Sequence, residues 1–519
     1  MIPRIIHQMW KDAAVPPRFV AWQEGWRRLH PGWDYRLWTD ATLDDFVRRH
    51  YPAYAGIYRA YPETIMRADM ARYLLLEHFG GVYADLDAEC LASFAPLLEE
   101  SRLVLGQEPP SHWTTERVRA RGFAWLAGNA VMASPAGHPF WAHLRRLLLL
   151  QSDARGVLDA TGPFLLTQAV IDYPDQAALR ILPPAAFNPA DRAGQLSAEM
   201  PPLARHHWSG TWVRHADRRL TWTRVRRRLR AAWRRRRQER SMSLREATRG
   251  LDRALLARVA PAEGSVAVLV PVRDAASTLP ALFDGLEALD WPRERLAIAF
   301  LEGGSQDGSA ALLRAWCAGP GRGFAAAQVF QEPARYDLTL KRWDPKLQRA
   351  RRGGLAAARN ALLRQGLGAA DWALWIDADV IDFPPDVLRR LLASGARLAT
   401  PHCVRQPGGR SFDLNTFVTD WEPPPEERGR HLLNGLYQPP RGLGRTYLHE
   451  LRYLPRVRVD GVGATMLLVD GNLHRAGLVF PERPYKQLIE TEALAALAAD
   501  LGIESWALPQ LEIIHAENG

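Results

Sequence analysis

The stretch TIMRADMARYLLLEHFGGVYADLD (residues 64–87) decides how the first half of the chain folds. Its apolar residues recur about every 3.6 residues from Thr64 to His78, which predicts a helix over that range. Gly80 and Gly81 follow at once and predict the end of the helix, because glycine tolerates the left-handed backbone of a helix cap. VYADLD (82–87) then predicts a short strand that follows the helix directly.

The same alternation of strand and helix extends through both halves of the chain. Further helices are predicted near 277–288, from about 307, and near 345–365. The other predicted strands are RIIHQMW (4–10), YRLWTD (35–40), SVAVLVPV (265–272), LAIAFLE (296–302) and WALWIDADV (372–380). Repeated alternation of this kind predicts the α/β class, with mainly parallel sheets covered by helices.

Composition excludes several classes of protein. The 519 residues are 47% hydrophobic and 24% charged, which excludes a disordered or fibrous chain and predicts two or three domains. Cys90, Cys317 and Cys403 lie far apart, so we expect neither a disulfide framework nor a structural zinc site. The first ten residues show no signal peptide, and no stretch predicts a membrane span. These observations together favour a cytoplasmic protein.

Positive charge is concentrated in one segment. Between Arg205 and Arg258 the chain has 18 Arg, no Lys and 4 acidic residues, so this segment carries more positive charge than the net +10 of the whole chain. Such a charge run marks a solvated linker or an interaction surface. We therefore expect domains at 1–215 and 261–519, joined by an Arg-rich helical linker at 216–260.

Within that linker, apolar residues form one helical stripe, namely Trp222, Val225, Leu229 and Trp233. A basic helix with such a stripe can lie on an anionic membrane surface, which would make the protein peripheral at the inner face of the membrane. Alternatively, the stripe packs between the two domains and leaves the arginines in solvent. Both interpretations remain open.

Two pairs of carboxylates each close an apolar strand, Asp85 with Asp87 and Asp377 with Asp379. Ligands of open α/β sheets bind at the carboxyl ends of the strands. Two carboxylates at i and i+2 can share a hard divalent cation, whose other ligands are water and substrate phosphates. An isolated Asp-x-Asp is more often a solvated turn, but its position after a strand favours a metal site here. The chain lacks the glycine-rich phosphate loops of ATPases and dehydrogenases.

Six ordered motifs in the first half closely resemble glycosyltransferase family 32. This family of DXD sugar transferases includes the fungal initiating α-1,6-mannosyltransferase. The motifs are IPRIIHQMW (2–10), YRLWTD (35–40), RADMARYLLLEHFGGVYADLD (67–87), NAVMASPAGHPF (129–140), TGPFLLTQAV (161–170) and HHWSGTW (206–212).

The resemblance implies a role for particular residues. Asp69 and Arg72 would hold the donor sugar and its diphosphate, and Asp85 would be catalytic and contact the ribose or the sugar. The metal ligands would be Asp87 and His207. The other donor-binding residues would be His7, Trp38, Asn129, Ser209 and Trp212. Alternatively, Asp69 and Arg72 form an ordinary pair on a helix surface, and Trp38 and Trp212 pack in the core.

The second half opens with VPVRDAASTL (270–279) and EGGSQDGS (302–309), which resemble the nucleotide-binding opening of family 2 glycosyltransferases. Its remainder is more similar to the fungal mannan-polymerase subunit family, glycosyltransferase family 62. The residues that carry this likeness are GLAAARNALL (354–363), DWALWIDADVIDFPPDVLRRL (371–391), FDLNTF (412–417), DGVGATMLLV (460–469), YKQLIETEALAALA (485–498) and IIHA (513–516).

This second resemblance also assigns roles. It implies Asp377 and Asp379 as the metal pair, with Asp377 also catalytic and His515 as a third metal ligand. Glu490 and Glu492 would be catalytic and face the acceptor or the sugar. Pro271, Glu302, Asp307 and Arg359 would bind the donor. Alternatively, the two glutamates are ordinary acidic residues of a first helical turn, and Arg359 and Asn360 face solvent.

Together the two resemblances imply a bifunctional, metal-dependent glycosyltransferase that retains anomeric configuration. Two GT-A-type, Rossmann-like α/β modules would each use Mn²⁺ or Mg²⁺ and a nucleoside-diphosphate sugar, either GDP-mannose or a UDP-sugar. The acceptor would be a glycan or a lipid-linked glycan in surface polysaccharide or lipopolysaccharide synthesis.

Two other functions stay open at this point. One module could be a glycan-binding scaffold, which would leave a single activity. The Arg-rich segment could instead bind nucleic acid, but it lacks the signature of any nucleic-acid-binding domain, and we therefore do not expect nucleic acid as a partner.

Overall fold

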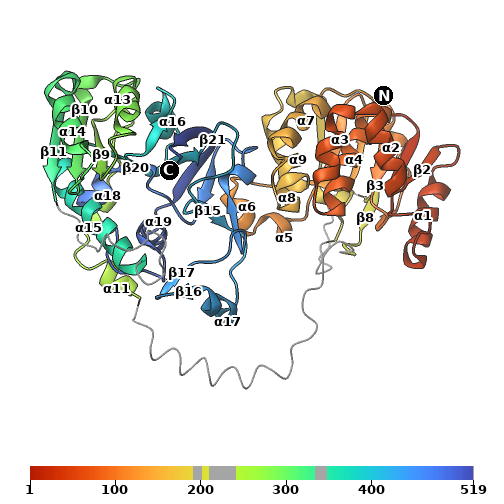
Figure 1. Ribbon diagram of the computed structural model, residues 1–519. Coiled ribbons are helices and arrows are strands. Elements are labelled where there is room, and N and C mark those ends of the chain that lie inside the picture. The colour runs from red at the N-terminus through yellow and green to blue at the C-terminus, as the bar shows by residue number, and fades with distance from the viewer. Residues whose placement is uncertain (191–200, 210–240, 333–347, 518–519) are drawn as a thin grey trace. The chain divides into compact units, whose positions relative to one another are not determined.

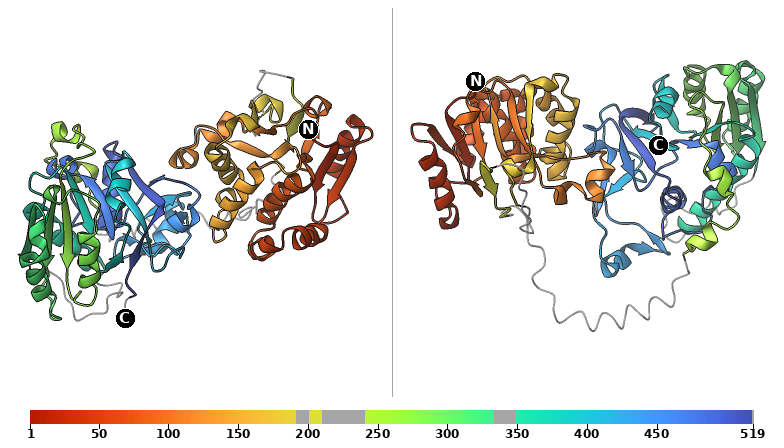
Figure 2. Two further views of the ribbon diagram at one scale, coloured as in Figure 1. Left: turned by 90° about the horizontal axis from the view of Figure 1, so that it is seen from above. Right: turned by 180° about the vertical axis from the view of Figure 1, so that it is seen from behind.

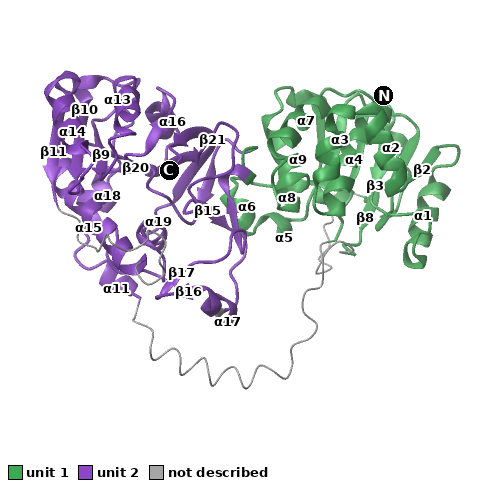
Figure 3. Cartoon of the chain, viewed as in Figure 1, with its two compact units in different colours: residues 1–218, 450–453 green, residues 219–449, 454–519 purple. Residues whose placement is uncertain are grey.

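The structure is a computed structural model that describes residues 1–190, 201–209, 241–332 and 348–517 (Figures 1 and 2). The chain forms two compact units (Figure 3). Unit 1 comprises Met1–Arg218 with Glu450–Tyr453, and unit 2 comprises Arg219–His449 with Leu454–Gly519. The apolar stripe from Trp222 to Trp233 and Trp212 lie outside the described residues.

Unit 1 contains a six-stranded sheet with the order β2-β1-β3-β6-β5-β7. Strands β1, β2 and β3 run parallel, whereas β6 runs antiparallel to both β3 and β5. The strands are β1 (Ile5–Met9), β2 (Asp34–Trp38), β3 (Gly81–Ala84), β5 (Leu103–Gln107), β6 (Ala127–Ser134) and β7 (Leu179–Leu182). A separate pair joins β4 (Ala88–Cys90) to β8 (Ala204–His206).

Helix α4 of unit 1 lies against β3 and β6 and leads into the first carboxylate pair. It spans Thr64–Phe79, one residue longer than predicted, and Gly80 and Gly81 follow with φ of 66° and 95°. β3 ends at Ala84, so Asp85 and Asp87 lie in the turn after the strand rather than inside it, as the predicted strand 82–87 had implied. The other helices are α1 (Pro17–Leu29), α2 (Asp40–His50), α3 (Pro52–Ala60), α5 (Pro110–Trp113), α6 (Glu116–Ala120), α7 (Phe140–Leu150), α8 (Val157–Ala160) and α9 (Pro163–Asp172).

Unit 2 contains a nine-stranded sheet, ordered β11-β10-β9-β12-β20-β14-β21-β13, with β19 paired to β21. Here β20 runs antiparallel to both β12 and β14. The strands are β9 (Val266–Val272), β10 (Leu296–Glu302), β11 (Ala326–Gln331), β12 (Trp372–Ile376), β13 (Val380–Asp382), β14 (Leu398–Val404), β19 (Val457–Val459), β20 (Met466–Asp470) and β21 (Ser505–His515).

Helices cover both faces of this second sheet. Ile298, Phe300, Leu374 and Ile376 share one core with α13 (Leu279–Glu287), α14 (Ser309–Ala318) and α16 (Val387–Ala393). On the opposite face, α15 (Gln348–Gly366) approaches so closely that a Cβ on Gly366 would lie 2.6 Å from Ala299. Side chains alternate along a strand, so Trp375 and Asp377 point to the α15 face. The remaining helices are α11 (Leu244–Ala247), α12 (Arg253–Leu256), α17 (Pro425–Arg428), α18 (Gly471–Arg475) and α19 (Glu490–Asp500).

Two expectations about the fold need correction. The sheets are mixed rather than mainly parallel, because β6 and β20 reverse direction beside the strands that carry the aspartates. The single strand predicted at 372–380 is two strands, β12 and β13, separated by a turn at Asp377. None of the helices in the described ranges is long and apolar enough to cross a membrane.

Candidate active sites

The first Asp-x-Asp turn is held by backbone hydrogen bonds on both sides. Asp85 N donates to Ala130 O of β6 at 2.8 Å, and Ala88 N donates to Asp85 O at 2.9 Å and closes the turn. The chain then enters β4, in which Ala88 pairs with His206 of β8. This register brings an imidazole from far along the sequence beside the two aspartates.

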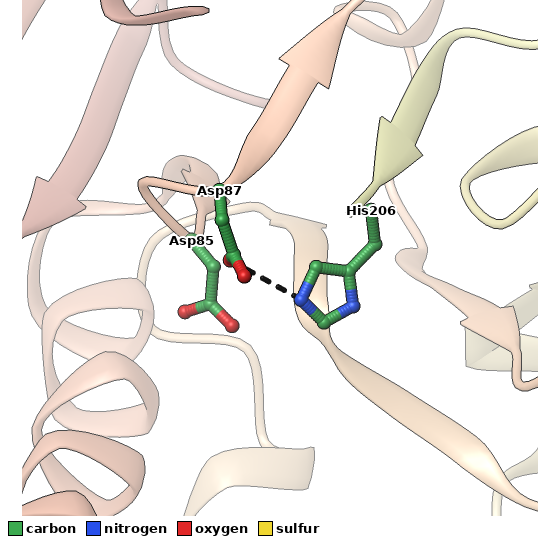
Figure 4. Close-up of side chains that lie close together, drawn as sticks. All are labelled: Asp85, Asp87 and His206. Carbon is green, nitrogen blue, oxygen red and sulfur yellow. Dashed lines mark ion pairs between the residues drawn. The ribbon is translucent and has the colours of Figure 1, made fainter. Parts of the chain in front are cut away.

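Asp85, Asp87 and His206 form a compact group of potential metal ligands (Figure 4). His206 Nε2 lies 3.2 Å from Asp87 Oδ1, and one ligand atom from each of the three residues lies within 4.8 Å of the others. Two carboxylates and an imidazole fit Mn²⁺, and the carboxylates fit Mg²⁺. Burial raises the pKa of Asp87, but hydrogen bonds from His206 and Ser209 N outweigh burial and bring that pKa to about 2.

A buried arginine holds the other carboxylate of this turn. Arg72 Nη1 lies 3.2 Å from Asp85 Oδ1 and donates to Asn129 O at 2.9 Å, while Nη2 lies 3.1 Å from Asp69 Oδ1. Asp69 also accepts hydrogen bonds from Asn129 Nδ2 at 2.9 Å and Thr161 Oγ1 at 3.2 Å. Burial, opposed by Arg72, raises the pKa of Asp69 to about 7. The alternative of a pair on a helix surface is wrong, because Asp69 and Arg72 are 3% and 2% exposed.

His207, the implied metal ligand, faces elsewhere. Its Nε2 lies 3.0 Å from Glu89 Oε2, and its ring stacks on Trp22 at 4.1 Å between centroids. The structure places His206, not His207, beside Asp87, since the β4–β8 register points the two neighbouring side chains to opposite sides. Ser209 reaches the site through its backbone, because Ser209 N donates to Asp87 Oδ2 at 2.8 Å.

His7 and Trp38 lie in an aromatic cluster against Phe79. His7 is fully buried, its Nε2 lies 3.0 Å from Gly80 O, and its Nδ1 accepts from Trp38 Nε1 at 3.1 Å. Burial lowers the pKa of His7 to about 4. The described contacts of both side chains therefore support the sheet, and their donor-binding roles stay predictions.

Unit 2 builds its Asp-x-Asp turn with the same hydrogen bonds. Asp377 N donates to Thr465 O at 2.9 Å, and Val380 N donates to Asp377 O at 3.1 Å. Val380 of β13 pairs with His515 of β21, and His515 Nε2 lies 3.1 Å from Asp379 Oδ2. His515 thus occupies in unit 2 the position that His206 occupies in unit 1.

Arg359 of α15 pairs with the first aspartate of this second turn, as Arg72 does in unit 1. Its Nη2 lies 3.1 Å from Asp377 Oδ1, and its Nη1 lies 3.1 Å from Glu490 Oε1. Arg359 and Asn360 are 6% and 5% exposed, so the alternative that they face solvent is wrong. Burial, opposed by Arg359, raises the pKa of Asp377 to about 6.

Glu490 and Glu492 do lie in the first turn of α19, but they are buried rather than solvated. Glu490 Oε1 also accepts from Arg352 Nη1 at 3.3 Å, and Glu492 accepts from Arg445 Nη1 at 2.9 Å. Glu490 pairs with both Arg352 and Arg359, and Arg359 connects it to Asp377 of the turn. Glu492 makes a separate ion pair with Arg445. Sequence reasoning missed Arg352 and Arg445.

The three donor-binding residues expected in the opening of unit 2 lie at the carboxyl ends of β9 and β10 or in the loop that follows. Glu302 accepts from Ser305 N, and Asp307 Oδ2 accepts from Ala276 N at 2.8 Å. Both carboxylates therefore shape the loops after these strands, and Pro271 lies within β9. The structure does not bring these residues into contact with Asp377 or Asp379.

Asp413 is a site residue that sequence reasoning missed. Its Oδ2 accepts from Thr465 Oγ1 at 3.1 Å, and its charge contributes to the raised pKa of Asp377. Gly463 leaves the room for this carboxylate, since a Cβ there would lie 1.3 Å from Asp413 Oδ2. The signal was present as the single acidic residue of FDLNTF (412–417), a motif used only for its resemblance.

Each half of the chain matches the model of a different protein family. Residues 16–104 match the glycosyltransferase sugar-binding region containing the DXD motif, and residues 256–484 match the Anp1 family. The two predicted resemblances, and with them the glycosyltransferase class, are confirmed.

Two curated relatives illustrate the similarity. Inositol phosphoceramide mannosyltransferase 1 of Schizosaccharomyces pombe is 38% identical over 27% of this chain and 40% of its own length. The mannan polymerase complex subunit mnn9 of the same organism is 29% identical over 48% of this chain and 79% of its own length. The chain thus spans less than half of the first relative.

Among solved structures, the mannosyltransferase PcManGT from Pyrobaculum calidifontis, in complex with GDP-Man and Mn²⁺, is 17% identical. It matches over 51% of this chain and 61% of its own, with a TM-score of 0.30.

Proposed function

We propose that the chain is a bifunctional, metal-dependent, retaining glycosyltransferase, with one GT-A-type module at 1–215, a second at 261–519 and the Arg-rich linker between them. The observation that carries the proposal is the repeated site. In each unit the first aspartate binds a buried arginine, the second faces a histidine, and that histidine pairs with the residue after the turn. A scaffold module without catalysis would have no need for this arrangement.

The repeat extends to the residue after the histidine. His207 N donates to Asp87 O at 3.0 Å, and Ala516 N donates to Asp379 O at 2.8 Å. His207 is therefore the counterpart of an alanine, which supports His206 as the ligand of unit 1.

A divalent cation fits the chemistry of these groups. Asp85, Asp87 and His206 would hold it in unit 1, and Asp379 and His515 are the corresponding pair in unit 2. When bound, such a cation stabilises the negative charge that develops on the departing diphosphate. Among the described residues, unit 2 has no group of three ligands as close as that of unit 1.

The chain's own side chains orient the donor. Arg72 and Arg359 fix the first aspartate of each turn, which is then positioned for hydrogen bonds to the ribose or the sugar. Asp69 and Asn129 form a buried polar wall beside Arg72 that suits sugar hydroxyl groups. The names of the relatives, mannosyltransferases and a mannan polymerase subunit, support mannose as the sugar and GDP-mannose as its donor.

Retention of configuration requires attack from the face that the diphosphate leaves, or a carboxylate nucleophile. Asp85 and Asp377 are both paired with arginines, which lowers their nucleophilicity. We therefore favour front-face attack by the acceptor through an oxocarbenium-like transition state. NMR of the fresh product would show the α-anomer from an α-linked donor, and a β-anomer would contradict this route.

Hydrolysis of sugar nucleotides tests the proposal directly. Purified protein is incubated with GDP-mannose, UDP-glucose and UDP-N-acetylglucosamine, with Mn²⁺, with Mg²⁺ or with a chelator, and the released nucleotide is measured. We expect release from GDP-mannose that the chelator abolishes. Failure to bind or hydrolyse any of these donors would contradict the proposal.

The acceptor is proposed to be a surface glycan or its lipid-linked precursor. The Arg-rich segment would bring the enzyme to an anionic membrane, but its stripe lies outside the described residues and that role stays a prediction. Flotation with anionic vesicles at low salt, lost at high salt, would support it, whereas protein that stays in the soluble fraction would contradict it.

A further inference from the structure

Unit 2 contains a basic cavity next to its Asp-x-Asp turn. The cavity has a volume of about 490 Å³, within the range of small-molecule sites. Its wall includes three arginines, Arg405, Arg410 and Arg441, against one carboxylate, Glu517. All three arginines are exposed, and within the described residues Arg405 and Arg441 make no ion pair. The cavity therefore carries an excess of positive charge.

The loop that carries two of these arginines is fixed by hydrogen bonds. Val404 and Ser411 form an antiparallel bridge at its base, and Gly408 N donates to Glu512 Oε2 at 2.8 Å. Ser411 Oγ is buried between His402 Nε2 at 2.9 Å and His449 Nδ1 at 3.1 Å. An anion would thus meet arginines on a loop that is already ordered, which reduces the entropy lost on binding.

Phe412 connects this cavity to the carboxylates. Its ring lies 3.9 Å from the ring of His515, which faces Asp379, and the guanidinium of Arg405 lies 5.0 Å above the same phenyl ring. A group bound in the cavity would therefore lie one aromatic side chain away from the proposed reaction centre.

The cavity and the loops expected to bind the nucleotide lie at different places along the sheet. Glu302 ends β10, and Asp307 lies in the loop after β10 and bonds to Ala276 of the loop after β9; both strands lie on one side of β12. The cavity is formed after β14 and β21, on the other side of β12. Since β12 ends at the Asp-x-Asp turn, the cavity faces the turn from the side opposite the nucleotide-binding loops.

We propose that this cavity is the acceptor subsite of unit 2, and that it takes a sugar bearing an anionic group, either a phosphate or a carboxylate. This inference rests on the proposed function of unit 2 as a transferase. Guanidinium groups bind both anions through paired N–H donors, and an excess of arginine over carboxylate favours them over neutral sugars.

Calorimetric titration of the full chain at low salt tests the inference. The probes are mannose 6-phosphate, glucuronate, inorganic phosphate and mannose, and GDP is titrated separately. We expect at least one anionic sugar to bind at least tenfold more tightly than mannose, and the arms with phosphate and carboxylate identify which anion is preferred. The double variant Arg405→Gln/Arg441→Gln should weaken that binding at least tenfold, with GDP affinity unchanged.

The matched control is Arg364→Gln, which removes an exposed arginine from α15 outside the cavity. It should leave every affinity unchanged. Equal binding of mannose and all anionic sugars, or an unaffected double variant, would overturn the inference. Competition between GDP and the anionic sugar, with both weakened in the double variant, would assign the arginines to the donor diphosphate and also overturn it. If the wild-type protein bound the anionic sugar but did not hydrolyse GDP-mannose, that result would instead contradict the proposed transfer activity.

Discussion

Asp87 and His206 show how a single register decides the chemistry of a site. Ala88 and His206 are opposite each other in the β4–β8 pair, so the imidazole of His206 reaches Asp87 while that of His207 reaches Glu89. Sequence alone offered two adjacent histidines in HHWSGTW, and nothing local distinguishes them. The distinction comes from a strand pairing across more than a hundred residues, which a local pattern cannot predict.

The pair of histidines gives a direct prediction. His206→Ala should weaken Mn²⁺ binding to unit 1 roughly tenfold or more, because loss of even an indirect partner of a metal ligand costs about 10- to 100-fold. His207→Ala should change the affinity less than threefold. Titration of Mn²⁺ monitored by electron paramagnetic resonance measures both, and a larger loss in His207→Ala would contradict the assignment.

A buried histidine in unit 2 predicts loss of stability in acid. His474 accepts from Trp375 Nε1 at 3.1 Å and lies 2.7 Å from Leu478 O, and burial lowers its pKa to about 4. Between pH 6.5 and 4 the unfolded chain binds a proton at this residue and the folded chain does not. Stability from this residue is therefore present above pH 6.5 and lost as the pH falls, by about 3 kcal/mol in total.

Denaturant unfolding from pH 7 to pH 4 checks this expectation. His474→Gln should be less stable than the wild type at pH 7, and the difference should shrink towards pH 4. Thr400→Val, which removes a buried hydroxyl of unit 2 that does not titrate in this range, is the control and should keep a constant difference. A difference for His474→Gln that does not change with pH would refute the explanation.

At the scale of elements, α4 and the start of β3 were predictable almost to the residue, because helical spacing and two glycines mark their junction, whereas the predicted strand ran three residues too far, to Asp87. The direction of β6 and β20 was not predictable. Neither segment was predicted as a strand: Asn129 and Ser134 interrupt the apolar residues of β6, and both strands are buried on every residue, so neither shows the alternation of a strand with one solvated face. The break between β12 and β13 was also missed, since Asp377 and Asp379 continue the alternation of the strand in sequence.

Gly81 tests the importance of the α4–β3 junction. Its φ is 95°, and a Cβ there would lie 2.6 Å from Ile5 O of β1. Gly32 has a similar φ of 79° with open space around it, so it is a matched control. Gly32→Ala should cost about 1–2 kcal/mol from the left-handed backbone alone.

Gly81→Ala should cost clearly more than the control, because β1 and β3 must separate, and Asp85 moves with β3. Equilibrium unfolding gives both free energies, and the Mn²⁺ titration shows whether the site is disturbed. Equal costs for the two variants would show that the close approach of β1 does not constrain this junction.

At the scale of the whole molecule, the strand-end pattern in the sequence located both aspartate pairs, and the two family resemblances singled out Arg72 and Arg359, which lie in helices. The sequence did not show that the two sites share one plan. Asp85 with Arg72 and His206 and Asp377 with Arg359 and His515 come from unrelated stretches, and only the strand pairings bring out their equivalence. Asp413 does not follow a predicted strand, and only the fold brings it beside Thr465, so it was missed.

Two equivalent sites in one chain predict two separable transfers, and this is the central claim. Asp87→Ala and Asp379→Ala, each made in the full chain, are compared with the wild type and the double variant for every donor and acceptor that the wild type uses. The products are separated by chromatography and mass spectrometry. Asp87→Ala should abolish one transfer and Asp379→Ala another, each by orders of magnitude in rate, with the other transfer kept at the wild-type rate. If either single variant eliminated all transfer, or if one of them changed nothing, two independent sites would be contradicted.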